Sequence, residues 1–319
     1  MITEWRHVYR RFRNFLGALR PSADQANCCT AAAVEVALAL RRSFRSGGSG
    51  GTDYLIIGGH GKGTAIQPAD TIDLLYELPM TMRRDEVAAG GPLVLLDVAA
   101  ALGQRFASVE PDKRWLTVLP QPGGPVVRVI PVFPCAAGGY LMVDAGSPAA
   151  GSSHWRQINP PAEVVKLDAA DQASAGKATH LIQMLKAWRR NRKVPLSPFA
   201  LELLVTEFIS VWNYQRRSLL FYDWMMRDFF FWLRFQGGQR LPIPGTPDAL
   251  QFDRSWLGPA EEAYLNATQA CLLERDNNNR EAELRWRQIF GPAFTDSIEL
   301  PAKEPQPLPP KDGKVSTAA

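Results

Sequence analysis

The first 44 residues place their apolar side chains at the spacing of two helices. Between Trp5 and Leu19 the apolar residues recur every three or four positions, which is typical of a helix that buries one face. A proline then ends this helix, and Ser22 or Asp24 provides the cap of a second, alanine-rich helix that we expect to run to about Phe44. The chain is therefore predicted to open with two consecutive helices.

Short apolar runs and one further helix predict a mixed α/β region as far as about residue 144. The segment SGGSGG, residues 46–51, is a flexible connection into the first strand. Strands are expected near residues 53–58, 72–78, 115–119, 126–133 and 139–144, with a helix near residues 92–107. This order of elements favours a mixed sheet flanked by helices.

From about Asp168 onward the pattern becomes helical. Leu181, Met184, Leu185 and Trp188 form one apolar stripe, and Ser197 followed by Pro198 is a good N-cap and first-turn pair for the next helix. The core face of that next helix is expected to contain Phe199, Leu203, Leu204, Phe208 and Trp212. Further helices are expected over 217–235 and 259–289, separated by a Pro/Gly loop, and residues 300–319 are expected to be disordered.

The composition is typical of a globular protein, which we expect in the cytoplasm. Of the 319 residues, 46% are hydrophobic and 21% are charged, and the net charge of +4 suits an anionic ligand in a cleft. The most apolar run, residues 217–235, contains Asp223, Arg227, Asp228 and Arg234, so we expect no membrane-spanning helix. The four cysteines include no Cys-x-x-Cys pair, which indicates reduced, buried thiols, and four histidines are too few to suggest zinc.

The stretch from Tyr54 to Pro79, YLIIGGHGKGTAIQPADTIDLLYELP, carries the clearest candidate chemistry. An apolar strand leads into a glycine-rich turn, and a second apolar strand starts at an aspartate. Glycines allow positive φ and the close approach of a backbone to a ligand, and successive N–H groups in such a turn can cradle phosphate oxygens. The segment is not a Walker A loop, because Gly63 separates Lys62 from Thr64.

This stretch resembles the first motif of the polymerase-β-like nucleotidyltransferases and, more narrowly, of the bacterial cGAS/DncV-like nucleotidyltransferases (CD-NTases). The family pattern Gly-Ser-Tyr-x-Arg-Gly-Thr-Ala-Ile falls on residues 58–66, and its Asp-x-Asp falls on residues 71–73. Three more segments resemble family elements in the same order: HWRQINPP around Trp155, GKATHLIQMLKAWRRNRKVPLSPFALELL, and AELRWRQIFGPAF. Together these matches extend over nearly the whole chain.

The resemblance implies a two-lobed α/β (α+β) fold of the polymerase-β-like type, with a cleft between a mixed-sheet lobe and a helical lobe. Residues 1–165 would form the nucleotidyltransferase lobe with the N-terminal helices, residues 166–299 the helical lobe, and residues 300–319 a disordered tail. The family chemistry is the metal-dependent transfer of a nucleotidyl group from ATP or GTP to a ribose hydroxyl. Its products are cyclic oligonucleotide signals in antiphage defence.

The carboxylates that hold two metal ions in this family are incomplete here. Thr71 stands at the first position and Asp73 at the second, so Asp73 is the candidate catalytic residue and ligand for Mg²⁺ or Mn²⁺. Asp70 could replace the first ligand only if a bulge or a late strand start turned it to the same face. Arg128 stands where the third carboxylate is expected, and it could neutralise phosphate charge instead. Gly59 replaces the motif serine.

The resemblance implies nucleotide contacts from both lobes. The candidate nucleotide-binding residues are Gly58, Gly59, Lys62, Gly63, Thr64, Arg128, Lys186 and Ser197. Several have a purely structural alternative. Lys62 and Lys186 could be solvated lysines, Thr64 could start a strand, and Ser197 could serve only as a helix cap.

Two functions from different classes follow. In the first, the protein keeps the fold, binds ATP or GTP with weak or absent synthesis, and acts beside an effector or regulatory protein of a defence system. In the second, it is an active nucleotidyltransferase with another ligand set, such as Asp70 and Asp73, and makes a cyclic or linear oligonucleotide. Nucleic-acid binding through the basic face is not favoured, and no membrane partner is expected.

Overall fold

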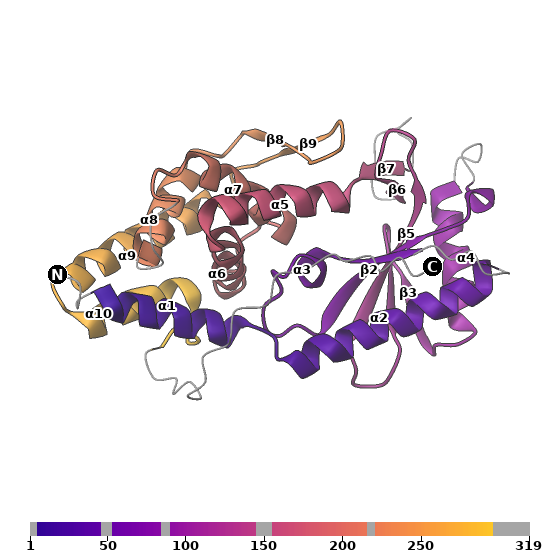
Figure 1. The fold of residues 1–319 in the computed structure, drawn as a ribbon, viewed down its shortest axis with the longest axis horizontal. Helices are drawn as coiled ribbons and strands as arrows, with labels where there is room; N and C mark the ends of the chain where they lie inside the picture. The colour runs from indigo at the N-terminus through magenta and orange to yellow at the C-terminus, as the bar shows by residue number, and fades with distance from the viewer. Residues whose placement is uncertain (1–4, 46–52, 84–89, 145–154, 216–220, 296–319) are drawn as a thin grey trace, which may run out of the picture.

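Two lobes lie side by side in the computed structural model of the protein, one built on a mixed sheet and one almost entirely helical (Figure 1). The two-lobed α/β architecture predicted from the sequence is therefore confirmed. The structure describes residues 5–45, 53–83, 90–144, 155–215 and 221–295. The predicted glycine-rich connection at residues 46–51 and the predicted disordered tail at residues 300–319 lie outside these ranges.

The sheet has the order β1-β2-β5-β4-β3, with β6 and β7 added beyond β5. Its strands are β1 (Tyr54–Ile57), β2 (Thr71–Glu77), β3 (Ser108–Pro111), β4 (Leu116–Leu119), β5 (Val126–Pro134), β6 (Tyr140–Val143) and β7 (Trp155–Ile158). All neighbours are antiparallel except β2 and β5, which run parallel. The sequence pattern did not predict β3 and β7, because their residues, SVEP and WRQI, do not form an apolar run.

Two helices cover one face of this sheet. They are α2 (Ala23–Phe44) and α4 (Gly90–Gly103), whose buried side chains share one apolar core with β2, β4 and β5. The predicted cap of α2 is present: the Ser22 hydroxyl accepts from the Gln25 amide at 3.1 Å, and the Gln25 side chain accepts from the Ser22 amide. The opposite face of β2 is left for the cleft between the lobes. A single helical turn, α3 (Gly58–Gly61), joins β1 to the segment before β2, and the 3-10 helix η1 (Met80–Met82) follows β2.

The second lobe is a helical bundle with one small hairpin. Its elements are α1 (Trp5–Leu19), α5 (Pro160–Ser174), α6 (Lys177–Arg192), α7 (Pro198–Val211), α8 (Tyr222–Leu233), β8 (Arg240–Pro242), β9 (Ala249–Gln251), α9 (Leu257–Arg275) and α10 (Asn279–Phe290). The first helix belongs here and not to the sheet lobe: the Phe12 ring lies 5.1 Å from Trp286 and 5.2 Å from Phe294. The structure thus differs from the expected division at residue 165, because α1 and α2 pack in different cores.

Several elements depart from the predicted boundaries for local reasons. The helix expected to start near Asp168 begins at Pro160, where the Asn159 side chain accepts from the Ala162 amide. The single helix expected over 259–289 is divided into α9 and α10, because Asn277 adopts φ 57°, a conformation that asparagine tolerates better than most residues. Phe199, predicted as core, is only partly buried at the cleft.

The described cysteines are all free, but they are not all buried as expected, since Cys28 is exposed on α2. None of the described helices combines the length and the apolar character that a membrane crossing requires.

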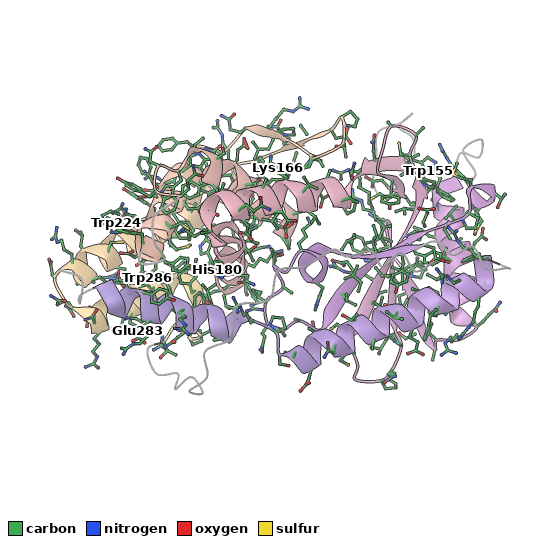
Figure 2. All side chains as sticks on the ribbon, viewed as in Figure 1. Trp155, Lys166, His180, Trp224, Glu283 and Trp286 are labelled. Atoms are coloured by element: carbon green, nitrogen blue, oxygen red, sulfur yellow. The ribbon has the colours of Figure 1, made fainter. Side chains whose placement is uncertain are left out.

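His180 on α6 links the stability of the helical lobe to pH. It is partly buried on α6 of this lobe (Figure 2), where its Nδ1 atom is hydrogen-bonded to the Tyr222 hydroxyl. Burial, helped by the charge of Arg20 and opposed by Asp171, lowers the pKa of His180 to about 4. Because the unfolded chain binds a proton more readily than the folded one between these pKa values, this contribution is complete above pH 6.5 and is lost as pH falls toward 4.

We therefore expect His180→Gln to flatten the acid side of the stability curve. Between pH 7 and 4.5 the parent protein should lose about 2–3 kcal/mol more unfolding free energy than the variant. Urea denaturation at a series of pH values measures this difference, and carboxylate titrations common to both proteins cancel in it. Parallel pH profiles would contradict the prediction.

Candidate nucleotide-binding cleft

A cleft of about 750 Å³ lies between the lobes, lined from one side by the β1–α3 turn, β2 and β5 and from the other by α5, α6 and α7. Seven lining residues are lysine or arginine and four are aspartate or glutamate. The lining therefore carries a net positive charge, which favours an anionic ligand.

The glycine-rich turn is folded too tightly to accept side chains. Gly58 has φ 63°, and a Cβ atom there would lie 2.3 Å from Oδ2 of Asp73. A Cβ atom on Gly61 would lie 2.2 Å from the Ile56 carbonyl oxygen. At Gly59, the position of the family serine, a Cβ atom would approach the backbone of Ala65 to 3.3 Å. Glycine is thus required at Gly58 and Gly61, and Gly59 has little spare room.

Much of the backbone of this turn is already hydrogen-bonded within the turn. The Lys62 amide donates to the Gly58 carbonyl at 3.0 Å, and the Thr64 and Ala65 amides both donate to the Gly59 carbonyl, at 2.8 and 3.0 Å. These three N–H groups are therefore not available to cradle phosphate in this conformation. The Gly63 carbonyl accepts from the Gln183 side chain of α6 at 3.2 Å, which places Gly63 against the helical lobe.

Asp73 faces a cation across the two parallel strands. The register of β2 and β5 pairs Asp73 with Arg128, and their side chains form an ion pair with 2.6 Å between Oδ1 and Nη2. The guanidinium also lies over the Trp115 ring, 5.7 Å from its centroid. Burial raises the pKa of Asp73, and the charge of Arg128 opposes that shift. The carboxylate predicted to bind a metal is thus engaged by the residue that replaces a family carboxylate.

Asp70, Thr71 and Asp73 all lie on the cleft side of the sheet lobe. Thr71 and Asp73 both line the cleft, whereas Ile72 between them is fully buried on the helix-covered face. Because β2 starts at Thr71, Asp70 precedes the strand and also lines the cleft, with its carboxylate accepting from the Thr71 hydroxyl at 3.4 Å. The strand thus starts late, which is one of the conditions under which Asp70 could replace the first metal ligand.

The donor atoms at this position do not fit a pair of divalent ions. In the described part of the chain, no set of three carboxylate, imidazole or thiol ligand atoms converges around Asp73. Two-metal sites need several oxygen ligands from the protein and the substrate. A guanidinium cannot lose its proton to become one of them.

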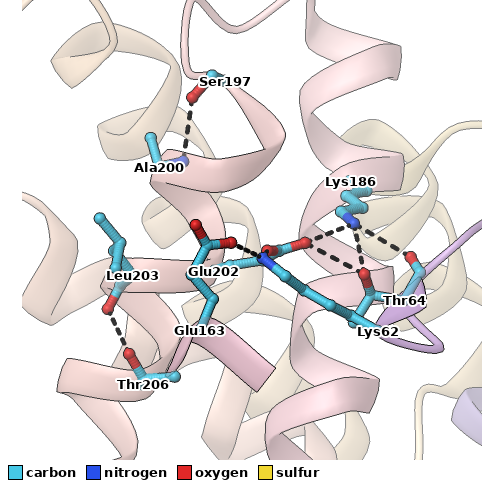
Figure 3. A network of polar contacts seen from close by, with 9 residues as sticks. All are labelled: Lys62, Thr64, Glu163, Lys186, Ser197, Ala200, Glu202, Leu203 and Thr206. Carbon is cyan, nitrogen blue, oxygen red and sulfur yellow. Dashed lines mark hydrogen bonds and ion pairs between the residues drawn. The ribbon is translucent and has the colours of Figure 1, made fainter. Parts of the chain in front are cut away.

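The predicted lysines belong to a buried network that joins the lobes (Figure 3). Lys62 Nζ lies 2.5 Å from Glu163 on α5 and 2.7 Å from Glu202 on α7. Lys186 Nζ on α6 lies 3.0 Å from Glu202 and 2.7 Å from the hydroxyl of Thr64, which itself donates to Glu202 at 3.1 Å. The turn at residues 62–64 is in this way tied to three helices of the other lobe.

Charge in this network is balanced, with two lysines against two glutamates. Burial alone would lower the pKa of Lys62, but Glu202 and Glu163 outweigh it and the net shift is upward. Burial lowers the pKa of Lys186, and Glu202 opposes this only in part. For Glu202, burial is outweighed by the two lysines, and its pKa is lowered. A phosphate group that contacts either lysine must therefore compete with a carboxylate.

Two other predicted residues have structural roles. Ser197 caps α7, its hydroxyl accepting from the Ala200 amide at 3.0 Å, while it also lines the cleft. The alternative in which Thr64 starts a strand is wrong, because Thr64 is fully buried in the irregular segment before β2.

Sequence reasoning missed Glu163, Glu202 and Arg156. A signal existed for Glu202, which is the glutamate of the Ser…Leu-Glu element at Ser197.

Arg156 on β7 lines the cleft and makes no ion pair within the described ranges. The other added arginines are engaged: Arg114 pairs with Asp144 at 2.8 Å, and Arg190 donates to the Gln67 carbonyl. Arg156 is consequently available to an anion in the cleft.

A two-lobed fold with a basic cleft beside a glycine-rich turn defines a protein of the nucleotidyltransferase-fold class. The profile of the Second Messenger Oligonucleotide or Dinucleotide Synthetase (SMODS) domain matches residues 7–170. The chain belongs to this family of bacterial CD-NTase-like proteins.

Known proteins agree with this assignment. A probable cyclic nucleotide synthase of Bacillus cereus (strain VD146) is 24% identical over 153 residues, a match that spans 45% of this chain and 44% of that protein. Among solved structures, the Vibrio cholerae cyclic AMP-GMP synthase DncV superposes with a TM-score of 0.69 and 11% identity over 90% of this chain and 97% of that chain. E. coli CdnC, in complex with a HORMA protein, superposes with a TM-score of 0.66 and 14% identity over 89% of this chain and 96% of that chain. At these identities the structural likeness shows the fold alone.

The network between the lobes leads to a stability prediction with a matched control on the same helix. Glu202→Gln should lower the unfolding free energy by about 3–5 kcal/mol, because it leaves two buried lysines with one carboxylate. Glu207→Gln, which removes a half-exposed carboxylate 3.8 Å from Lys166, should stay within about 0.5 kcal/mol of the parent. Urea denaturation of both variants checks this, and equal losses would show that the network does not hold the lobes.

Proposed function

We propose that this protein binds a nucleoside triphosphate, ATP or GTP, in the inter-lobe cleft and has weak or absent nucleotidyl-transfer activity. It would serve a bacterial antiphage signalling system in the cytoplasm, beside an effector or regulatory protein. The observation that carries this proposal is the 2.6 Å ion pair between Asp73 and Arg128. It occupies the position where the family holds its metal ions.

The charge at this position supports binding over catalysis. Two-metal transfer needs carboxylates that attract two divalent ions, whereas this pair has no net charge before any ion arrives. Arg128 has a fixed positive charge and a planar fork that suits phosphate oxygens. It can turn from Asp73 to a phosphate group, so the nucleotide would be neutralised by protein side chains and not by metal.

The neighbouring folds support the choice of ligand and the idea of a partner. Solved structures of similar fold include CdnC with ATP and DncV with ATP and GTP, and one CdnC structure contains a HORMA protein. The free cationic side chain of Arg156 gives the cleft of this chain a further contact for a polyphosphate.

The second candidate is an active nucleotidyltransferase that uses Asp70 and Asp73 with Mg²⁺ or Mn²⁺. The start of β2 at Thr71 favours it, because both aspartates then line the cleft. Such an enzyme would need to displace Arg128 from Asp73 before a metal could bind.

Product analysis separates the two candidates. We expect the full chain, incubated with labelled ATP, GTP, CTP and UTP and either Mg²⁺ or Mn²⁺, to give no product above the level of Asp73→Ala, while calorimetry detects triphosphate binding. The double variant T71D/R128D restores the family carboxylates and should gain metal-dependent synthesis. Asp168→Ala replaces an exposed residue on α5; this control variant should behave like the parent protein. Product from the parent chain that disappears in Asp73→Ala would establish the active enzyme instead.

Arg156 provides a test of the binding site that does not depend on synthesis. Arg156→Ala should weaken triphosphate binding roughly tenfold or more, since it removes a charged hydrogen-bond donor worth about 1.5–3 kcal/mol. Arg275→Ala, which removes an exposed arginine at the end of α9, should leave the affinity unchanged. Calorimetry at one fixed salt concentration compares them, and equal affinities would place the ligand elsewhere.

A further inference from the structure

Three acidic ligand groups meet in the interior of the helical lobe, apart from the cleft. The carboxylates of Asp223 and Glu274 and the thiol of Cys271 each offer a ligand atom, and these atoms all lie within 4.8 Å of one another. Asp223 stands in the first turn of α8, while Cys271 and Glu274 are three residues apart at the end of α9 and so share one face. The packing of α8 on α9 brings the three together.

The carboxylate of Asp223 is buried without a hydrogen-bond or ion-pair partner among the described residues. The residue is only 1% exposed, and neither of its carboxylate oxygens accepts a hydrogen bond of normal geometry from the residues that the structure describes. Burial raises the pKa of Asp223 and outweighs the backbone amide of Trp224 and the charge of Arg227, which favour the ionised carboxylate. Buried carboxylates are normally paired, hydrogen-bonded or bound to metal, because leaving one uncompensated costs several kcal/mol. The described part of the chain therefore leaves this carboxylate uncompensated, as expected at a ligand site.

Glu274 is oriented in the way that metal-binding carboxylates usually are. Its Oε1 atom accepts from the Trp286 indole at 3.0 Å and from Arg11 at 3.3 Å, which fixes the side chain from α10 and α1. Its Oε2 atom is buried and without a partner. One oxygen is thus held by surrounding donors, and the other remains free for a ligand.

We propose that Asp223, Cys271 and Glu274 bind a zinc-like divalent cation that supports the helical lobe. A thiolate with two carboxylate oxygens suits a borderline-soft ion such as Zn²⁺, with a fourth position for water. The charges also balance, because the three negative groups are matched by a divalent ion together with Arg11, whose side chain is fully buried beside Glu274. This proposal is the opposite of the expectation from the sequence, in which four histidines are too few to suggest zinc.

The distances are close to those that such an ion requires. Zinc–ligand bonds of 2.0–2.3 Å put tetrahedral ligand atoms roughly 3.3–3.8 Å apart. The three atoms lie no more than 4.8 Å apart, so small rotations of the two carboxylates would close the site. The proposal is independent of nucleotide binding and of the chemistry in the cleft.

Metal analysis and cobalt substitution of the full chain test the site directly. Protein purified without chelator should contain about one zinc ion per chain by mass spectrometry of the metal content. After chelation, added Co²⁺ should give the thiolate-to-cobalt charge-transfer absorption of a sulfur ligand. Cys271→Ser should abolish this absorption and weaken zinc binding by at least about 10–100-fold.

A matched cysteine and an isosteric aspartate variant complete the experiment. Cys28→Ser removes an exposed thiol on α2 and should keep both the zinc and the absorption band. Asp223→Asn should lose zinc and its thermal stabilisation by zinc, while far-UV circular dichroism confirms that it is folded. A parent protein without stoichiometric zinc and without the band, or a band that persists in Cys271→Ser, would overturn the proposal. The cluster would then hold protons, consistent with burial raising the pKa of Asp223 and Cys271.

Discussion

The parallel pairing of β2 with β5 determines the chemistry of the cleft. It sets Asp73 opposite Arg128 in register and turns both side chains to the face that the helices leave uncovered. The same carboxylate packs against Gly58, so the turn that would hold phosphate and the acid that would hold metal constrain each other. A substitution on one strand therefore changes the role of the other strand, and the arginine at residue 128 converts a potential metal ligand into half of an ion pair.

The second constraint is the buried network that ties the glycine turn to the helical lobe. Lys62 and Lys186 are the cationic residues that family resemblance assigns to phosphate, yet each is matched here by a glutamate. In a low-dielectric interior such a pair is stable only while both partners stay. A triphosphate that reached these lysines would release Glu163 or Glu202, and this exchange would loosen the contact between the lobes. If the proposed nucleotide binds in this way, its binding and the relative position of the lobes would be coupled through the same atoms.

Local rules predicted much of the fold, and long-range pairing explains what they missed. The caps at Ser22 and Ser197, the glycine at Gly58 and the alternation of Thr71, Ile72 and Asp73 follow from a few neighbouring residues. The contact between Lys62 and Glu163 spans 101 positions, and α1 joins a core whose other buried residues lie between Leu167 and Phe294. Neither depends on local spacing, and the division expected at residue 165 placed both α1 and Glu163 with the sheet lobe, whereas the structure places them with the helical lobe. The opposition of Asp73 and Arg128 likewise requires the strand register and not only the presence of both residues.

The cleft and the buried cluster treat negative charge in opposite ways. In the cleft each of Asp73, Glu163 and Glu202 has a lysine or arginine within 3 Å, so the protein supplies the compensating cations from its own chain. In the helical lobe Arg11 pairs with Glu274, whereas Asp223 is buried with no ion pair among the described residues. Asp70, which lines the cleft without an ion pair in the described part of the chain, is exposed to solvent, whereas Asp223 is almost fully buried, so the lack of a counter-charge costs more at Asp223. The position at which this protein would need an external cation is thus the interior of the helical lobe, whereas the site where its relatives would bind metal is already neutralised by Arg128.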